Sequence, residues 1–237
     1  MTGYNILKWD SDFFGFPVAR ITEKNINKQQ LKSIIDELKQ NHVSLAYWSV
    51  NTKDVLSDES AKSLNGFFTG EKVIYVKKLD SFKKSSLSLN KELIKYSEKK
   101  PDKDLLDLIV EGGIFSRFYV DHKIGKKQYE ELHKLWMTNS VKNNTIFVKK
   151  DDDKIIAFVS LNEKNNRGNI DFIVVNKNYR GKGLAAMLMK NAHIWFASNG
   201  YQTVQADTQI ENTNACKMYE KLGYIKETTE KIYHFWL

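Results

Sequence analysis

The sequence is poor in several features that mark particular classes of protein. It has one cysteine, Cys216, so no disulfide can form within the chain, which favours a reducing compartment. It has only two prolines, Pro17 and Pro101, which argues against a loop-dominated scaffold. No apolar run approaches the ~18 residues that a membrane span needs. The start of the chain lacks the charged and apolar regions of a secretory signal. We therefore expect a cytoplasmic protein without a membrane partner.

Three familiar site patterns are also missing. The five histidines are dispersed, without cysteine or carboxylate partners at ligand spacing, so no metal is expected. Neither the GxxxxGK[ST] phosphate loop nor the GxGxxG dinucleotide fingerprint occurs. Cys216 has no histidine nearby in the sequence, which argues against a thiol nucleophile.

The charge balance is basic. The chain of 237 residues carries 37 basic and 29 acidic side chains, a net charge of +8, and 41% of its residues are hydrophobic. The hydrophobic share is that of a globular protein. The positive charge suits a polyanionic partner, but the lysines are scattered, as they also are on an ordinary solvated surface. Charge alone leaves both interpretations open.

The spacing of apolar residues predicts an α/β fold, in which helices cover a sheet. In the first part of the chain we expect a strand–turn–strand unit over 4–21, helices over 29–40 and from 51 or 52 to 64, and strands over 44–50 and 67–76. Residues 79–103 are rich in Ser and Lys and indicate a connector with one weak helix. Beyond them we expect helices over 125–140, 181–198 and 213–222, strands over 145–149, 154–161, 168–175 and 203–207, and final strands after Tyr224.

A glycine loop follows one of the predicted strands and precedes a long helix. Gly181 and Gly183 have no Cβ, so an anion can approach their backbone closely. The helix N-terminus adds unpaired N–H groups and partial positive charge, and Arg180 and Lys182 add full charges. Together these features indicate a pyrophosphate site. Taken alone, the same loop is equally compatible with a turn that merely starts a helix.

The loop resembles the acyl-CoA motif [RQ]-x-x-G-x-[GA] of the GNAT superfamily of N-acyltransferases, matched by Arg180, Gly183 and Ala185. The segment 212–224 resembles a second family signature, N-x-x-A-x-x-x-Y-x-x-x-G-[FY]. The resemblance covers about 126–237. It implies a mixed, mostly antiparallel sheet flanked by helices, with an incomplete GNAT-like N-terminal half over 1–100 and an acyl-CoA-binding domain over 101–237.

The resemblance also implies roles for residues. Tyr219 would protonate the departing CoA thiolate, and an N–H group at Val174 or Val175 would polarise the thioester. Asn212, Ala215 and Tyr219 are spaced to share one face of a helix. Asp171 is the best-placed carboxylate for the base, with water as the alternative. The residues expected to bind CoA are Val174, Val175, Arg180, Gly181, Lys182, Gly183, Leu184, Ala185 and Asn212.

Two further segments indicate the acceptor. The stretch WDSDFFGF at 9–16 and the stretch SRFYVD at 116–121 resemble segments of the dTDP-aminosugar N-acyltransferases, of the dTDP-fucosamine acetyltransferase type. Arg117 is suited to gripping a diphosphate. Phe13, Phe14 and Trp48 are suited to stacking on a thymine or covering a sugar, although an aromatic cluster at a turn is also common in a core.

This resemblance implies an enzyme that moves an acyl group from acyl-CoA to the amine of a dTDP-linked 3- or 4-amino-dideoxyhexose. Such products serve bacterial surface glycans such as the O-antigen of lipopolysaccharide. The acyl group, acetyl or a longer one such as 3-hydroxybutanoyl, stays open, as does the sugar epimer. The alternative acceptor is a protein amine or a polyamine. A homodimer is implied, and no nucleic acid is expected as a partner.

Overall fold

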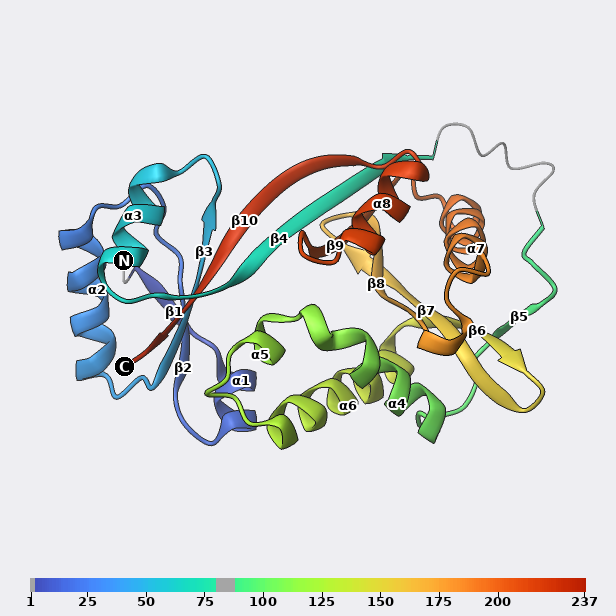
Figure 1. The fold of residues 1–237 in the computed structure, drawn as a ribbon, viewed down its shortest axis with the longest axis horizontal. Helices are drawn as coiled ribbons and strands as arrows, with labels where there is room; N and C mark the ends of the chain where they lie inside the picture. Colours follow the sequence, from blue (N-terminus) through green and yellow to red (C-terminus); the bar gives the residue numbers. More distant parts are fainter. Residues whose placement is uncertain (1–2, 80–87) are drawn as a thin grey trace.

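The computed structural model describes residues 3–79 and 88–237 and shows a ten-stranded sheet with helices on both faces (Figure 1). The strand order is β1-β2-β3-β10-β4-β9-β8-β7-β6-β5. Neighbours pair antiparallel except for β2 with β3 and β8 with β9, which are parallel. The predicted α/β fold with a mixed, mostly antiparallel sheet is confirmed.

The first part of the chain forms four strands and three helices. They are β1 (Tyr4–Ile6), α1 (Lys8–Phe14), β2 (Val18–Ile21), α2 (Lys28–Gln40), β3 (Leu45–Asn51), α3 (Val55–Ser63) and β4 (Phe67–Lys78). The strand–turn–strand prediction for 4–21 is wrong in its middle, where α1 replaces the turn. This helix ends at Gly15, which takes the left-handed conformation with φ of 77°. Helix α3 starts later than predicted because Asp54, not Asn51 or Thr52, accepts the hydrogen bond from its first turn.

The second part begins with a strand where the connector was expected to hold a weak helix. Its elements are β5 (Leu93–Lys95), α4 (Lys103–Gly112), α5 (Arg117–Val120), α6 (Lys126–Asn143), β6 (Thr145–Asp151), β7 (Lys154–Lys164), β8 (Arg167–Val175), α7 (Leu184–Ser198), β9 (Thr203–Gln209), α8 (Thr213–Lys221) and β10 (Ile225–Trp236). Short 3₁₀ turns span Gly113–Phe115 and Lys177–Tyr179. The weak helix is thus corrected to β5, which pairs with β6, and 80–87 of the connector lie outside the described residues.

The last strand joins the two parts of the chain. Strand β10 lies between β3 and β4, so the C-terminal strand completes the sheet of the N-terminal half (Figure 1). Helix α6 is 18 residues long and packs against both α4 and α5. In the described ranges, none of the helices combines the length and apolar character of a membrane span.

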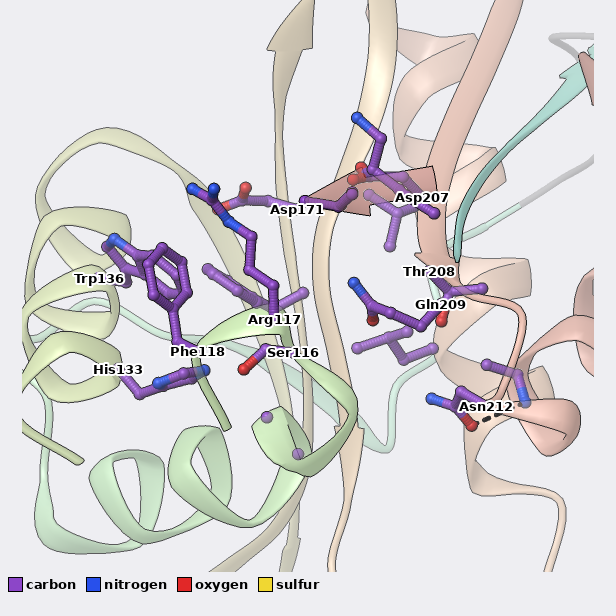
Figure 2. A pocket seen from close by; sticks show the side chains of 18 of the residues that line it. Ser116, Arg117, Phe118, His133, Trp136, Asp171, Asp207, Thr208, Gln209 and Asn212 are labelled. Carbon is purple, nitrogen blue, oxygen red and sulfur yellow. Dashed lines mark hydrogen bonds between the residues drawn. The ribbon is translucent and has the colours of Figure 1, made fainter. Parts of the chain in front are cut away.

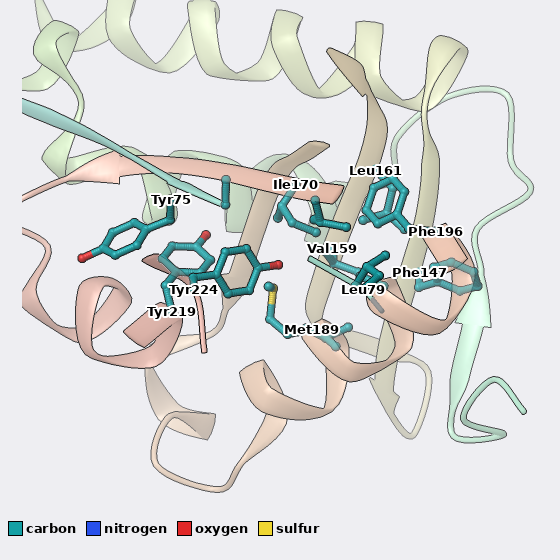
Figure 3. Close-up of a cluster of buried hydrophobic side chains, with 14 of the residues drawn as sticks. Tyr75, Leu79, Phe147, Val159, Leu161, Ile170, Met189, Phe196, Tyr219 and Tyr224 are labelled. Atoms are coloured by element: carbon teal, nitrogen blue, oxygen red, sulfur yellow. The ribbon is translucent and has the colours of Figure 1, made fainter. Parts of the chain in front are cut away.

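Two hydrophobic clusters hold helices on opposite faces of the second half of the sheet. Helices α7 and α8 pack through Leu188, Met189, Phe196 and Tyr219 on one face (Figure 3). Helices α4 and α6 pack through Leu105, Ile109 and Met137 on the other face. The sheet between them is therefore fixed from both sides, apart from one place where two of its strands diverge.

Strands β8 and β9 diverge in the middle of the sheet. They pair in parallel over only three positions, from Gly168 with Val204 to Ile170 with Ala206. Beyond this point β8 continues to Val175 and β9 to Gln209 without pairing to each other. The unpaired edges open a cleft, and the candidate site lies in it.

Candidate active site

Two cavities meet where β8 and β9 diverge. The first has a volume of about 600 Å³ and lies between α5, α6 and the ends of β8 and β9. The second, about 500 Å³, lies between the glycine loop, α8 and the end of α4. Both are lined by Ile173, Val174, Asn212 and Ala215. A donor in one cavity and an acceptor in the other can therefore meet beside β8.

The second cavity contains the predicted CoA loop. Gly181 and Gly183 both have φ of 79°, and a Cβ at either position would meet nothing within 4 Å. Gly183 precedes the first residue of α7, so the N-terminus of that helix opens at the cavity. Most of the predicted CoA residues line this cavity, namely Val174, Val175, Arg180, Gly181, Gly183, Leu184, Ala185 and Asn212. Lys182 is not among the lining residues, and its ammonium lies 5.0 Å from the Tyr179 ring centre.

Arg180 has a more specific place than the rim charge that the sequence suggested. Its Nε donates to the carbonyl of Val175 at 3.0 Å, and its guanidinium forms a 2.8 Å ion pair with Glu111 on α4. Because Glu111 offsets much of the charge, Arg180 mainly fixes the loop to β8 and to α4. The backbone N–H groups are then left to receive an anion.

The direction of the β8 backbone separates the two predicted thioester donors. The Asn176 N–H donates to Ile156 on β7 at 2.9 Å. Successive N–H groups of a strand point in alternate directions. The Val174 N–H is therefore directed at β7, and the Val175 N–H at the cleft. The carbonyl of Val175 agrees with this, since it faces Arg180. Of the two backbone donors predicted from the sequence, Val175 is the one whose N–H is directed at the cleft.

The face of α8 brings the three family residues together. Asn212 caps the helix by accepting from the Ala215 N–H at 3.3 Å, and Ala215 and Tyr219 line the first cavity with it. Small Ala215 leaves room where the two cavities meet. Tyr219 is 2% exposed, and its ring centre lies 5.3 Å from that of Tyr75 (Figure 3). Burial raises the pKa of Tyr219 above its ordinary value, so the hydroxyl keeps its proton at neutral pH.

Asp171 lies at the entrance of the diverging strands. Its carboxylate accepts from the Ser140 hydroxyl at 3.1 Å and from the Asn144 amide at 2.8 Å, both at the C-terminal end of α6. Burial raises the pKa of Asp171, while these two hydrogen bonds oppose the rise. The carboxyl is thus held in one orientation in the first cavity, with its titration moved toward neutral pH. Such a group is suited to accepting a proton from an ammonium.

His133 is a cavity residue that sequence reasoning assigned to a core or surface role. It is 2% exposed, its Nδ1 lies 2.8 Å from the Tyr129 carbonyl, and it lines the first cavity. Since a carbonyl only accepts, Nδ1 carries the proton and Nε2 keeps its lone pair. Burial lowers the pKa of His133, which keeps it neutral. Helical periodicity alone carries no signal that distinguishes such a residue from core.

Arg117 lies on the opposite side of the first cavity from α8 (Figure 2). Its guanidinium is 3.7 Å from the ring centre of Tyr47 and 4.3 Å from that of Phe118. Burial lowers the pKa of Arg117 to about 10, so it remains a cation at neutral pH. The predicted Arg117 is thus in the cavity, held flat on aromatic rings.

The predicted aromatic contacts of the acceptor are corrected. Trp48 is fully buried on the other face of β3, where its indole N–H donates to the Glu23 carbonyl at 2.9 Å. Its neighbour Tyr47 faces the cavity instead, because successive side chains of a strand alternate. Phe13 and Phe14 belong to the cluster behind Tyr47 and line none of the described cavities. Their role is to pack α1 against α5.

Asp121, the last residue of the second acceptor segment, also has a structural role. It is 1% exposed, and its Oδ2 accepts a hydrogen bond from the Trp236 indole N–H at 2.9 Å. His234 Nδ1 lies 2.6 Å from the same oxygen. These contacts tie the turn after α5 to strand β10. Strand β10 therefore helps to maintain the shape of the site around Arg117. Within the described ranges, no group of acidic, histidine and cysteine side chains is arranged to hold a metal.

The fold and the cleft between diverging parallel strands define this chain as a GNAT-fold protein. A GCN5-related N-acetyltransferase from Sphaerobacter thermophilus shares the fold with a TM-score of 0.60 at 11% identity, covering 98% of this chain and 75% of that one. Residues 114–224 match the model of the acetyltransferase (GNAT) family. The matched range contains Arg117, Asp171, the glycine loop and Tyr219.

Three curated relatives share parts of the sequence. A spore coat polysaccharide biosynthesis protein of Bacillus subtilis is 24% identical over 51% of this chain and 43% of its own length. A streptothricin acetyltransferase of Escherichia coli is 34% identical over 31% of this chain and 42% of its own length. An N-alpha-acetyltransferase of Arabidopsis thaliana is 34% identical over 30% of this chain and 36% of its own length. The chain thus spans less than half the length of each of these relatives.

Proposed function

We propose that this protein is an N-acyltransferase that moves an acyl group from acyl-CoA to the amine of a dTDP-linked 3- or 4-amino-dideoxyhexose. The observation that carries the proposal is the pair of cavities meeting at Ile173, Val174 and Ala215. One has a glycine loop at a helix N-terminus, which suits the pyrophosphate of CoA. The other holds Arg117, Asp171 and Tyr219, which suit an anionic acceptor that carries an amine.

The proposed reaction uses these groups in turn. Asp171 accepts a proton from the acceptor ammonium, and the neutral nitrogen attacks the thioester carbon. The Val175 N–H stabilises the negative charge that develops on the thioester oxygen. The carbon–sulfur bond breaks, and the Tyr219 hydroxyl gives its proton to the sulfur. The nitrogen releases its second proton to solvent as the amide forms, Asp171 passes the proton it accepted to solvent, and Tyr219 regains one from solvent.

The sugar acceptor is supported by the relative in spore coat polysaccharide biosynthesis and by the position of Arg117. A cytoplasmic role in making surface glycans fits a soluble nucleotide-linked substrate. The acetyltransferases for streptothricin and for protein amino termini favour other amines, and their similarity is confined to about 30% of this chain. A protein amine or a polyamine is therefore the alternative acceptor.

A thiol-release assay that crosses acyl-CoAs with amines tests the proposal. The donors are acetyl-CoA and 3-hydroxybutanoyl-CoA, and the acceptors are dTDP-3-amino and dTDP-4-amino dideoxyhexoses, spermidine and a short peptide with a free amino terminus. Thiol release that requires a dTDP-aminosugar supports the proposal. Release with spermidine or the peptide, and none with any dTDP-aminosugar, would assign the alternative acceptor.

A further inference from the structure

One end of the first cavity is built by the N-terminal half of the chain together with α5. Its lining residues there are Arg20, Lys24, Tyr47, Ser49 and Arg117. Arginine is scarce in this chain, with four among 37 basic residues. Two of the four therefore line one end of one cavity. Arginine differs from lysine in offering a planar fork that binds phosphate oxygens in pairs.

The two arginines lack acidic partners among the described residues. The ion pairs in those ranges include Arg167 with Glu227 and Arg180 with Glu111, but none for Arg20 or Arg117. Asp10, on α1, is the nearby carboxylate: burial raises its pKa, and the charges of Arg117 and Arg20 oppose the rise. It forms no ion pair with either arginine. Two guanidinium groups thus keep donors available to a ligand.

The hydroxyl of Tyr47 is a further unpaired group at the same place. Tyr47 is 2% exposed, and its hydroxyl has no hydrogen-bond partner among the described residues. A buried hydroxyl without a partner costs free energy that a ligand oxygen would recover. The ring of Tyr47 lies beneath the Arg117 guanidinium at 3.7 Å, so hydroxyl and guanidinium belong to one rigid unit.

We infer that Arg20, Arg117 and the Tyr47 hydroxyl form a diphosphate subsite at this end of the acceptor cavity. The inference rests on the proposed function for the identity of the acceptor and adds Arg20 and Tyr47 to its binding residues. Arg117, stacked on Tyr47, offers its fork to one phosphate, and exposed Arg20 at the cavity wall reaches the other. Tyr47 donates to an oxygen between them. Lys24 is already bonded to the Ser49 carbonyl and contributes charge rather than a directed contact.

The subsite and the groups that do the chemistry are built by different elements. Asp171 and Tyr219 come from β8 and α8 of the second half, whereas Arg20 and Tyr47 come from β2 and β3 of the first. The N-terminal half together with α5 then selects acceptors by a diphosphate, and β8 and α8 provide the groups that transfer the acyl group. An acceptor without a diphosphate would lose the contacts with the first half.

Calorimetric titration of the full-length protein tests the subsite. The protein is first saturated with CoA, so that the CoA cavity is occupied, and is then titrated with dTDP, pyrophosphate and thymidine. We expect dTDP and pyrophosphate to bind and thymidine to bind at least tenfold more weakly than dTDP. Tyr47→Phe keeps the ring under Arg117 and removes only the hydroxyl. It should weaken dTDP binding by about tenfold.

Arg20→Gln should weaken dTDP binding by a similar factor. Because Arg20 is exposed, the substitution should leave the fold intact, so a loss of dTDP binding would not be due to misfolding. The matched control is Arg167→Gln, which removes the same charge from a surface ion pair and should leave dTDP binding within about twofold. If thymidine binds as tightly as dTDP, or if Tyr47→Phe and Arg20→Gln both bind dTDP like the wild type, the subsite is wrong. Binding of dTDP that depends on Arg20 and Tyr47, without turnover of any dTDP-aminosugar, supports the subsite and removes the proposed acceptor.

Discussion

Asp171 and Asp207 occupy matching positions on β8 and β9, each one residue beyond the Ile170–Ala206 pair at which the two strands diverge. Both line the first cavity, and the charge of Asp207 adds to the burial that raises the pKa of Asp171. The sheet therefore places a carboxyl with a raised pKa at the opening of the cleft. In the proposed mechanism this carboxyl takes the proton of the acceptor ammonium.

Replacing Asp171 with Asn should reduce turnover by ~10²-fold or more at neutral pH, because it removes the proton acceptor. Wild-type turnover should fall as the pH drops through the raised pKa of Asp171, since the protonated carboxyl accepts no proton. In the variant, turnover should recover at high pH, where the amine is already neutral. Initial rates from pH 5 to 10 measure both effects. Nearly normal turnover of the variant at every pH would assign the proton to water.

Tyr219→Phe should lower turnover by about 10²–10⁴-fold while both Michaelis constants change little, because the lost proton transfer belongs to the transition state. The matched control is Tyr75→Phe. Tyr75 packs on Tyr219 and its hydroxyl donates to Glu220 at 3.0 Å, but it lines neither of the two cavities that meet where β8 and β9 diverge. Turnover of the Tyr219 variant within a few-fold of wild type, at intact CoA binding, would exclude it as the proton donor.

Gly183→Asp should weaken CoA binding by roughly tenfold or more, since it places a carboxylate among the N–H groups that receive the pyrophosphate. Gly200→Asp is the control, because Gly200 also has positive φ, with nothing within 4 Å of a Cβ, and lies just beyond the other end of α7. Both variants bear the same strain and charge. Equal CoA affinity of the two, measured by calorimetry, would contradict the assignment of the loop.

Arg117→Ala should raise the Michaelis constant for the dTDP-aminosugar far more than that for acyl-CoA. A lost charge-assisted contact is worth roughly 1.5–3 kcal/mol, or one to two decades. The Michaelis constant of Arg117→Lys for the dTDP-aminosugar should lie between those of the wild type and Arg117→Ala. This variant keeps the charge but loses the planar guanidinium that lies on Tyr47. Steady-state kinetics with each substrate varied in turn separates the constants. A rise confined to acyl-CoA would place Arg117 on the donor side.

The stability of the fold should fall in mild acid. Burial lowers the pKa of His234 to about 4, while its contact with Asp121 opposes the change. As the pH falls from about 6.5 to 4, the unfolded chain binds a proton that the folded chain does not, so the free energy of unfolding decreases. The loss is on the order of 3 kcal/mol for this residue.

Urea unfolding at pH 7.5, 6, 5 and 4.5 measures this loss. In His234→Gln the decrease should be shallower, although the variant starts from a lower stability because Asp121 loses a partner. If the free energy of unfolding of the variant decreases with falling pH as steeply as that of the wild type, other groups govern the acid response. His193, whose pKa burial also lowers to about 4, is the next residue to test in that case.

The sequence predicts the parts of the site that depend on neighbouring residues of the chain. The glycine loop and the Asn212–Ala215–Tyr219 face are local patterns, since each is built by one loop or one helix turn. The order of β10 between β3 and β4 is not local, because it pairs residues from opposite ends of the chain. Tyr47 and Trp48 show the same limit: β3 is buried on both faces, so alternation gives no sign of which aromatic faces the cavity.

The sequence prediction lacks helix α4, although the start of this helix carries a signal. Pro101 precedes Asp102, whose side chain accepts from the Leu105 N–H at 2.9 Å and so caps the helix. The helix matters to the site because its C-terminal Gly112 lies against Val174, where a Cβ would come within 2.6 Å of a methyl group. That close approach brings the backbone of α4 to the junction of the two cavities.

The most direct test of the central claim compares kcat/KM for a dTDP-linked aminosugar, the same free aminosugar and a peptide amino terminus, each with saturating acetyl-CoA. Thiol release gives the rate, and mass spectrometry identifies which amine has gained the acyl group. Because only the first acceptor reaches Arg117 with a diphosphate, kcat/KM for it should exceed the other two by at least ~10²-fold. An equal or greater kcat/KM for the peptide would contradict the account.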